Sequence, residues 1–225
     1  MKSREHRKIF GKLLCAVAAI GLAPVHATAF GPDYGTSLQS VVGASFWSDD
    51  VNFSEGSTEV DLSTMPTLGI SWWGSFEGNF SNWGAETGLR FSWGSDNTRS
   101  ASANGTALEI DAEIYLLDIF AGPSYDKNLE KWHFHGGVGP LVMFGWVDDA
   151  RRQVSSTGKV PIRDTNDSDV AIGIYGRAGL EYELTGYNSI GFSVRILYTK
   201  MDFEAPTGNV DLFGIQPAFT YTKRW

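Results

Sequence analysis

Residues 83–93 read WGAETGLRFSW, and their side chains alternate between two faces. One face carries Trp83, Ala85, Thr87, Leu89, Phe91 and Trp93. Glu86 and Arg90 lie on the other face. Successive side chains of a β-strand point to opposite sides, so this period of two predicts a strand with one largely apolar and one polar face.

The same period recurs along the rest of the chain. It is present in residues 66–76, 108–116, 132–146, 170–184, 190–198 and 213–225, and more weakly near 38–48. With 83–93 these segments make eight strands. Short connections near 77–82, 121–131 and 185–188 alternate with longer ones near 49–64, 95–106, 148–168 and 202–209. We therefore expect an all-β fold, a single eight-stranded antiparallel up-and-down barrel.

The apolar face of such a barrel can point either inward or outward. A soluble barrel or sandwich places its apolar face inside, whereas a lipid-embedded barrel places it outside. Aromatic residues cluster where the apolar faces end, at Trp83, Trp132, Tyr182 and Trp225 on one rim and at Trp93, Trp146 and Tyr198 toward the other. Interfacial anchors have this arrangement. The polar faces hold many glycines and almost no lysine, which suits a narrow interior, so we favour a transmembrane β-barrel.

The N-terminal residues differ in composition from the rest. Five Lys and Arg residues and one acid precede an apolar stretch from Leu13 to Val25, and Ala27-Thr28-Ala29 has the pattern of a signal peptidase site. We interpret 1–29 as a cleaved signal peptide and 30–225 as the barrel domain, with an N-terminal core helix as the alternative. Residues 30–225 carry 13 Lys and Arg against 25 Asp and Glu. Such a chain repels phosphates, so we expect no nucleic-acid partner.

The predicted polar faces carry charges of both signs. They are Glu86, Arg90, Glu109, Asp111, Glu113, Arg177, Glu181 and Arg195. If the 94–107 hairpin pairs symmetrically, Arg90 lies opposite Asp111, and Arg195 lies diagonal to Glu181 and Arg177. We expect a lumenal ion-pair network that plugs the barrel, with a gate or proton path as the alternative. Asp118 falls on the predicted lipid face, so its strand should end or bulge before it.

The last strand carries a resemblance to a known family. Phe213, Ile215, Pro217, Phe219 and Tyr221 alternate toward a terminal Trp225. With the signal and the eight strands, this resembles the small outer membrane β-barrel proteins, the opacity-type surface antigens and the outer membrane protein A- and X-like barrels.

The resemblance implies a location in the outer membrane of a Gram-negative bacterium, among its lipid and lipopolysaccharide. It also implies that Phe219, Tyr221 and Trp225 form a signal for the barrel assembly machinery. Lys223 and Pro217 depart from the family pattern, and Pro217 leaves the register of the last strand open.

Candidate chemistry is sparse. His133 and His135 share the polar face without an evident third ligand, so we expect a hydrogen-bonding role, no metal and no cofactor. Some barrels of this family modify lipid A with a His and a Ser, but no His-x-Ser element occurs here. Arg151, Arg152, Lys159 and Arg163 are candidate contacts for lipopolysaccharide phosphates, with an ordinary solvated loop as the alternative.

We therefore expect a non-enzymatic outer membrane surface protein. Its loops, chiefly 49–64 and 148–168, would contact a host, a neighbouring molecule or lipopolysaccharide, in adhesion, surface interaction or envelope integrity. The second hypothesis is a narrow conduit for small or hydrophobic solutes. The third is a lipid A-modifying enzyme.

Overall fold

A computed structural model describes residues 36–48, 53–55, 58–60, 63–76, 82–101, 107–155, 158–203 and 209–225. The predicted signal peptide, 1–29, lies outside these residues. Within them, no helix is long and apolar enough to cross a membrane.

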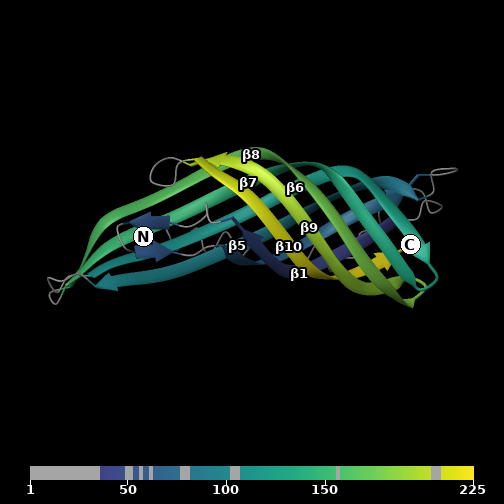
Figure 1. The fold of residues 1–225 in the computed structure, drawn as a ribbon, viewed down its shortest axis with the longest axis horizontal. Helices are drawn as coiled ribbons and strands as arrows, with labels where there is room; N and C mark the ends of the chain where they lie inside the picture. Colours follow the sequence, from purple (N-terminus) through teal and green to yellow (C-terminus); the bar gives the residue numbers. More distant parts are fainter. Residues whose placement is uncertain are drawn as a thin grey trace. The chain divides into compact units, whose positions relative to one another are not determined.

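Eight strands close into one barrel, as the sequence predicts (Figure 1). They are β1 (Thr36–Trp47), β4 (Thr64–Ser75), β5 (Trp83–Ala101), β6 (Ala107–Leu129), β7 (Trp132–Ser155), β8 (Gly158–Thr185), β9 (Asn188–Asp202) and β10 (Asn209–Arg224). The order around the barrel is β1-β10-β9-β8-β7-β6-β5-β4, with every neighbouring pair antiparallel. A small hairpin of β2 (Phe53–Glu55) and β3 (Thr58–Val60) lies in the connection between β1 and β4.

The apolar side chains of most strands point outward. Ile172 on β8 is 80% exposed and Phe219 on β10 is 73% exposed, while Thr220 and Arg195 are buried. This confirms the inverted polarity expected of a lipid-embedded barrel.

Aromatic side chains form rows on the outer surface. Trp93, Tyr115 and Trp146 are direct neighbours across β5, β6 and β7. Toward the other end, Trp83 packs edge-on against Tyr125 and Trp132 against Tyr182, with ring centroids 5.2 and 5.1 Å apart. Ten residues separate the two levels along β5 and along β6, from Trp83 to Trp93 and from Tyr115 to Tyr125, which is the length that crosses a bilayer.

Beyond the row of Trp93, Tyr115 and Trp146, the strands continue. The ribbons of β5, β6, β7 and β8 extend past their neighbours at the left of Figure 1. Most of the predicted loops 95–106 and 148–168 is therefore strand, and only residues 156–157 separate β7 from β8.

The predicted faces of residues 108–116 were wrong. Ile110, Ala112 and Ile114 point into the barrel and are at most 2% exposed. Glu109, Asp111 and Glu113 lie on the outer face. The reason is that this segment lies beyond the aromatic row, where water replaces lipid outside, so the polarity of an ordinary soluble sheet returns.

The expectation for Asp118 was wrong for the same reason. It shares the inward face of Ile110 and Ala112, is buried, and lies within β6, which continues to Leu129.

The register around Pro217 is regular. On the β9 side Pro217 pairs with Val194 without a shift. On the β1 side the ladder holds at Gly43–Ala218 and Phe46–Ile215, and Ala44 and Ser45 between them have no ladder partner on β10. Proline lacks an N–H, which accounts for this gap. The two strands nevertheless stay close together here, as the space beside Gly43 shows: a Cβ added to Gly43 would lie 2.2 Å from the Pro217 backbone oxygen.

Candidate functional site

The barrel interior has two unlike halves. The half toward the short turns after β4, β6 and β8 is polar and charged; we call it the short-turn end. The half toward the long hairpins, the hairpin end, is filled by a cluster of buried apolar side chains. The cluster comprises Trp47, Met65, Ile110, Ala112, Ile114, Leu116, Phe120, Leu141, Met143, Val147, Ala171, Tyr175, Leu197, Met201, Phe203, Val210 and Leu212.

The first polar group spans the lumen from β8 to β5 and β1. Arg177 donates from Nε to Glu86 Oε2 at 2.7 Å and from Nη1 to Gln39 Oε1 at 2.7 Å. The Tyr175 hydroxyl donates to Glu86 Oε1 at 2.7 Å. Gly137 makes room for this carboxylate, because a Cβ there would lie 2.0 Å from Glu86 Oε1. These bonds link β8 across the lumen to Glu86 on β5 and to Gln39 on β1, and so fix the three strands relative to one another.

The second group joins β9 to β6. Arg195 donates from Nη2 to Asp118 Oδ1 at 2.7 Å and from Nη1 to Asp118 Oδ2 at 2.9 Å. Its guanidinium carbon lies 4.6 Å from the ring centre of Phe120 and 4.9 Å from that of Tyr175. A bidentate pair packed against two aromatic rings is a rigid, desolvated plug.

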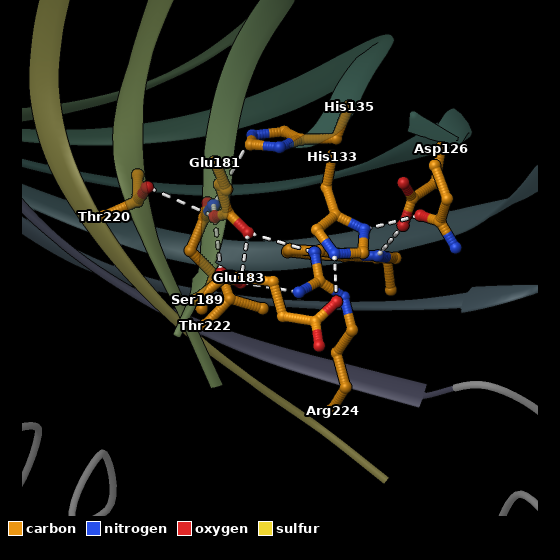
Figure 2. Close-up of polar contacts among 12 residues, drawn as sticks. Asp126, His133, His135, Glu181, Glu183, Ser189, Thr220, Thr222 and Arg224 are labelled. Carbon is orange, nitrogen blue, oxygen red and sulfur yellow. Dashed lines mark hydrogen bonds and ion pairs between the residues drawn. The ribbon is translucent and has the colours of Figure 1, made fainter. Parts of the chain in front are cut away.

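The third group lies at the short-turn end (Figure 2). The Glu181 carboxylate is fully buried. Its donors are Gln39, Ser189, Thr220, Thr222 and Arg224, which come from β1, β9 and β10. Five donors compensate the desolvation of one buried charge.

The two histidines lie beside this group. His133 hydrogen-bonds Asn128 through Nδ1 and Glu183 through Nε2, the latter at 3.3 Å. His135 stacks on Trp73 with ring centroids 5.5 Å apart, and its Nε2 is 3.4 Å from Gln39 Nε2. Figure 2 shows both rings beside Glu181 and Glu183. No group of three or more His, Cys, Asp or Glu among the described residues is arranged to hold a metal ion.

Arg90 differs from the other lumenal arginines. It is 1% exposed, and its Nη1 and Nη2 have no hydrogen-bond partner. Asp118 lies directly opposite it on β6.

The structure brings five of the eight predicted lumenal charges into the interior: Glu86, Arg90, Arg177, Glu181 and Arg195. The placement of Glu109, Asp111 and Glu113 in the lumen was wrong, as described above. The predicted pairings were also wrong. Ala101 pairs with Ala107, so Asp111 lies opposite Asn97, and Arg195 lies opposite Arg177 instead of diagonal to it.

Several lumenal residues were missed. They are Gln39, Asp118, Tyr175, Gln216 and Arg224. Gln39, Tyr175, Gln216 and Arg224 lie opposite the predicted apolar face of their strands, so strict alternation is the signal that could have found them. For Asp118 alternation gave the wrong face, because the apolar face of 108–116 points inward.

The predicted lipopolysaccharide contacts are dispersed. Arg151 points into the barrel, where it is buried and donates from Nε to Asp149 Oδ2 at 2.9 Å, so its prediction as a lipid contact was wrong. Lys159 donates to Glu109 at 2.7 Å, and Arg152 lies 3.9 Å from the same carboxylate. The Lys159 hydrogen bond lowers the pKa of the Glu109 carboxyl below its ordinary value. The side chain of Arg163 lies outside the described part.

The predicted assembly signal lies on β10. Phe219 and Tyr221 point outward, and Trp225 donates its backbone N–H to the Thr36 oxygen at 3.0 Å. Lys223 places its Nζ 5.5 Å from the Trp225 ring centre. The last residue is therefore attached to the first described strand, where the barrel closes.

A family model described as an outer membrane protein beta-barrel domain matches residues 13–222. No curated protein matches the chain. Among solved structures, the attachment invasion locus protein Ail of Yersinia pestis, in complex with the heparin analogue sucrose octasulfate, is 16% identical, with a TM-score of 0.48 over 85% of this chain and 99% of that one. OprG of Pseudomonas aeruginosa is 13% identical, with a TM-score of 0.42 over 85% and 94%. The outer membrane protease OmpT of Escherichia coli is 8% identical, with a TM-score of 0.48 over 87% and 98%.

Proposed function

This chain belongs to the outer membrane protein β-barrel domain family, and from that premise we propose that it is a closed, non-conducting surface protein whose extracellular strand ends make its contacts. It resides in the outer membrane of a Gram-negative bacterium. In such barrels the short turns face the periplasm and the long hairpins face the outside. The short-turn end is accordingly periplasmic and the hairpin end extracellular.

The packing of the lumen carries the proposal. Toward the periplasm Glu181 and Arg177 tie opposite walls together, and toward the outside Met143, Leu197 and Leu212 are at most 2% exposed. Side chains held this way leave no path for hydrated ions. This supports a structural frame over a conduit for solutes.

Single-channel recording in planar bilayers tests this closure. We expect the purified barrel to give no conductance steps at high salt, where an open porin in the same bilayer gives stable ones. A variant that removes the central plug, Tyr175→Ser with Arg177→Ser, should conduct. Stable steps from the wild-type barrel would contradict the proposal and favour the conduit.

The extracellular part is a rigid display surface. Beyond the row of Trp93, Tyr115 and Trp146, the inner face of β6 and β7 continues the apolar core through Ile114 and Val147. On β8, Val160 and Ile162 are 59% and 57% exposed at a level where water, not lipid, surrounds the protein. Apolar side chains presented to water from a rigid sheet support a role in surface contact.

Binding by whole cells tests the contact role. Cells producing the wild type should attach to host cells or to each other several-fold better than cells producing Val160→Ser with Ile162→Ser. Leu184→Ser is the matched control, because Leu184 is a similarly exposed apolar residue of β8 at the periplasmic end. Equal attachment by all three strains would overturn the proposed role of β8.

No observation favours an enzyme. In the described part of the chain, the hydrogen-bond partners of the two histidines are Asn128, Glu183 and Gln39, none of which supplies the hydroxyl or thiol of a serine, threonine or cysteine nucleophile. Comparison of lipid A acyl chains from cells with and without the protein tests this directly, and we expect identical spectra.

A further inference from the structure

The centre of the lumen holds more positive than negative charge. Four charged groups surround Arg90: Arg195 and Arg177 repel it, and Asp118 and Glu86 attract it. With Arg90 these are three guanidinium groups and two carboxylates. The buried carboxylate of Glu181 belongs to the periplasmic group with Arg224.

Each oxygen of the two central carboxylates accepts a hydrogen bond from another residue. Glu86 accepts from Tyr175 and from Arg177 on its two oxygens. Asp118 accepts from Arg195 on both of its oxygens. Arg90 Nη1 and Nη2 hydrogen-bond neither carboxylate, although Asp118 is the direct neighbour of Arg90 across the β5–β6 pair.

Three buried N–H-bearing nitrogens remain without an acceptor in this region. They are Nη1 and Nη2 of Arg90 and Nε of Arg195. An unpaired charge with unsatisfied donors is strongly disfavoured in a desolvated interior, so an anion there would remove both penalties at once.

We propose that the centre of the lumen binds one small inorganic anion, of the class of chloride, against the guanidinium of Arg90. It balances the third positive charge and accepts from the donors that the protein leaves free. This site is separate from the contact surface on β8, and it stands whether or not that surface binds a partner.

The surroundings set the size of the anion. A Cβ on Gly69 would lie 2.7 Å from the Arg90 Cγ, so the side chain is closely packed at its base. Toward the outside, the hydroxyls of Ser45, Thr67 and Ser92 bond to one another, and Gln216 donates to Ser45 at 3.0 Å. Beyond these hydroxyls, toward the hairpin end, lies the buried apolar cluster. These closely packed surroundings favour a compact anion, because the acyl chain of a fatty acid would have to displace the packed core.

Bromide, which replaces chloride and scatters anomalously, tests the site in the wild-type protein. Crystals of the complete barrel grown in sodium bromide should show an anomalous peak within hydrogen-bond distance of Arg90 Nη1 or Nη2. Bromide peaks confined to the surface, with none at Arg90, would overturn the proposal. An organic acid bound at Arg90 in that map would overturn the assignment to an inorganic anion.

Thermal unfolding provides a second test. The unfolding midpoint of the wild type, followed by gel mobility of unboiled and heated samples, should be higher by roughly 5 °C in sodium chloride than in sodium gluconate of equal ionic strength. Arg90→Met should abolish this difference, because it removes the charge that the anion balances. Lys200→Met is the control, since Lys200 is an exposed cation on the outer surface, and it should keep the difference. An equal chloride effect in all three proteins would place the ion elsewhere and contradict the proposal.

Discussion

Arg177 and Arg195 are direct neighbours across the β8–β9 pair, yet their guanidinium groups bind carboxylates on two different strands of the opposite wall. Arg177 reaches Glu86 on β5, and Arg195 reaches Asp118 on β6. Like charges directly opposite each other in a sheet destabilise it unless each has a counter-charge. The two ion pairs therefore hold four strands in one arrangement.

Breaking one of these pairs should cost much stability. Asp118→Asn leaves Arg195 buried without its counter-charge, and we expect a loss of about 3–5 kcal/mol in the free energy of unfolding. Replacing both residues, Asp118→Leu with Arg195→Met, should cost clearly less, because no unpaired charge remains. Urea unfolding of the refolded barrel, followed by tryptophan fluorescence, measures both. A double variant as unstable as Asp118→Asn would show that packing, not charge pairing, dominates at this site.

The limits of sequence reasoning are clearest at β6. The period of two placed all eight strands, because alternation depends only on backbone geometry. It assigned the wrong face to Ile110 and Glu109 because the medium outside the barrel changes from lipid to water within one strand. The ion pair between Arg195 and Asp118, which are 77 residues apart, depends on the closed arrangement of all strands and has no local signal in the sequence.

The corrected face of β6 makes a prediction of its own. Ile110→Ala should lower the free energy of unfolding by about 2–5 kcal/mol, because Ile110 is completely buried in the apolar cluster. Asp111→Ala, one residue on and on the outer face, should change it by less than about 0.5 kcal/mol. The same urea titration compares them. A larger loss of stability for Asp111→Ala than for Ile110→Ala would instead support the lumenal placement of Glu109, Asp111 and Glu113.

The lipid-facing surface can be mapped along β8 with a single substitution type. Ile174→Arg should destabilise the barrel by about 2–4 kcal/mol, because Ile174 lies between the two aromatic levels and faces the hydrocarbon. Ile162→Arg is the matched control on the same strand, similarly exposed but beyond the upper aromatic row. Refolding into lipid vesicles and unfolding in denaturant gives both values. Equal costs at the two positions would contradict the assigned membrane level.

The C-terminal residue should matter more for assembly than for the finished barrel. In the folded state Trp225 is 46% exposed and contributes one backbone hydrogen bond to Thr36 and a contact with Lys223. Its deletion should therefore change the unfolding free energy of the refolded barrel by about 1 kcal/mol or less. In cells, the same deletion should delay the appearance of the heat-modifiable form in pulse-chase labelling, because the family resemblance assigns Trp225 to recognition by the assembly machinery. Thr222→Ala provides the contrast, since it removes a donor to the buried Glu181 and leaves Phe219, Tyr221 and Trp225 in place. It should lower stability while leaving the rate of assembly unchanged, and a delay equal to that of the Trp225 deletion would show that slow assembly merely follows from lost stability.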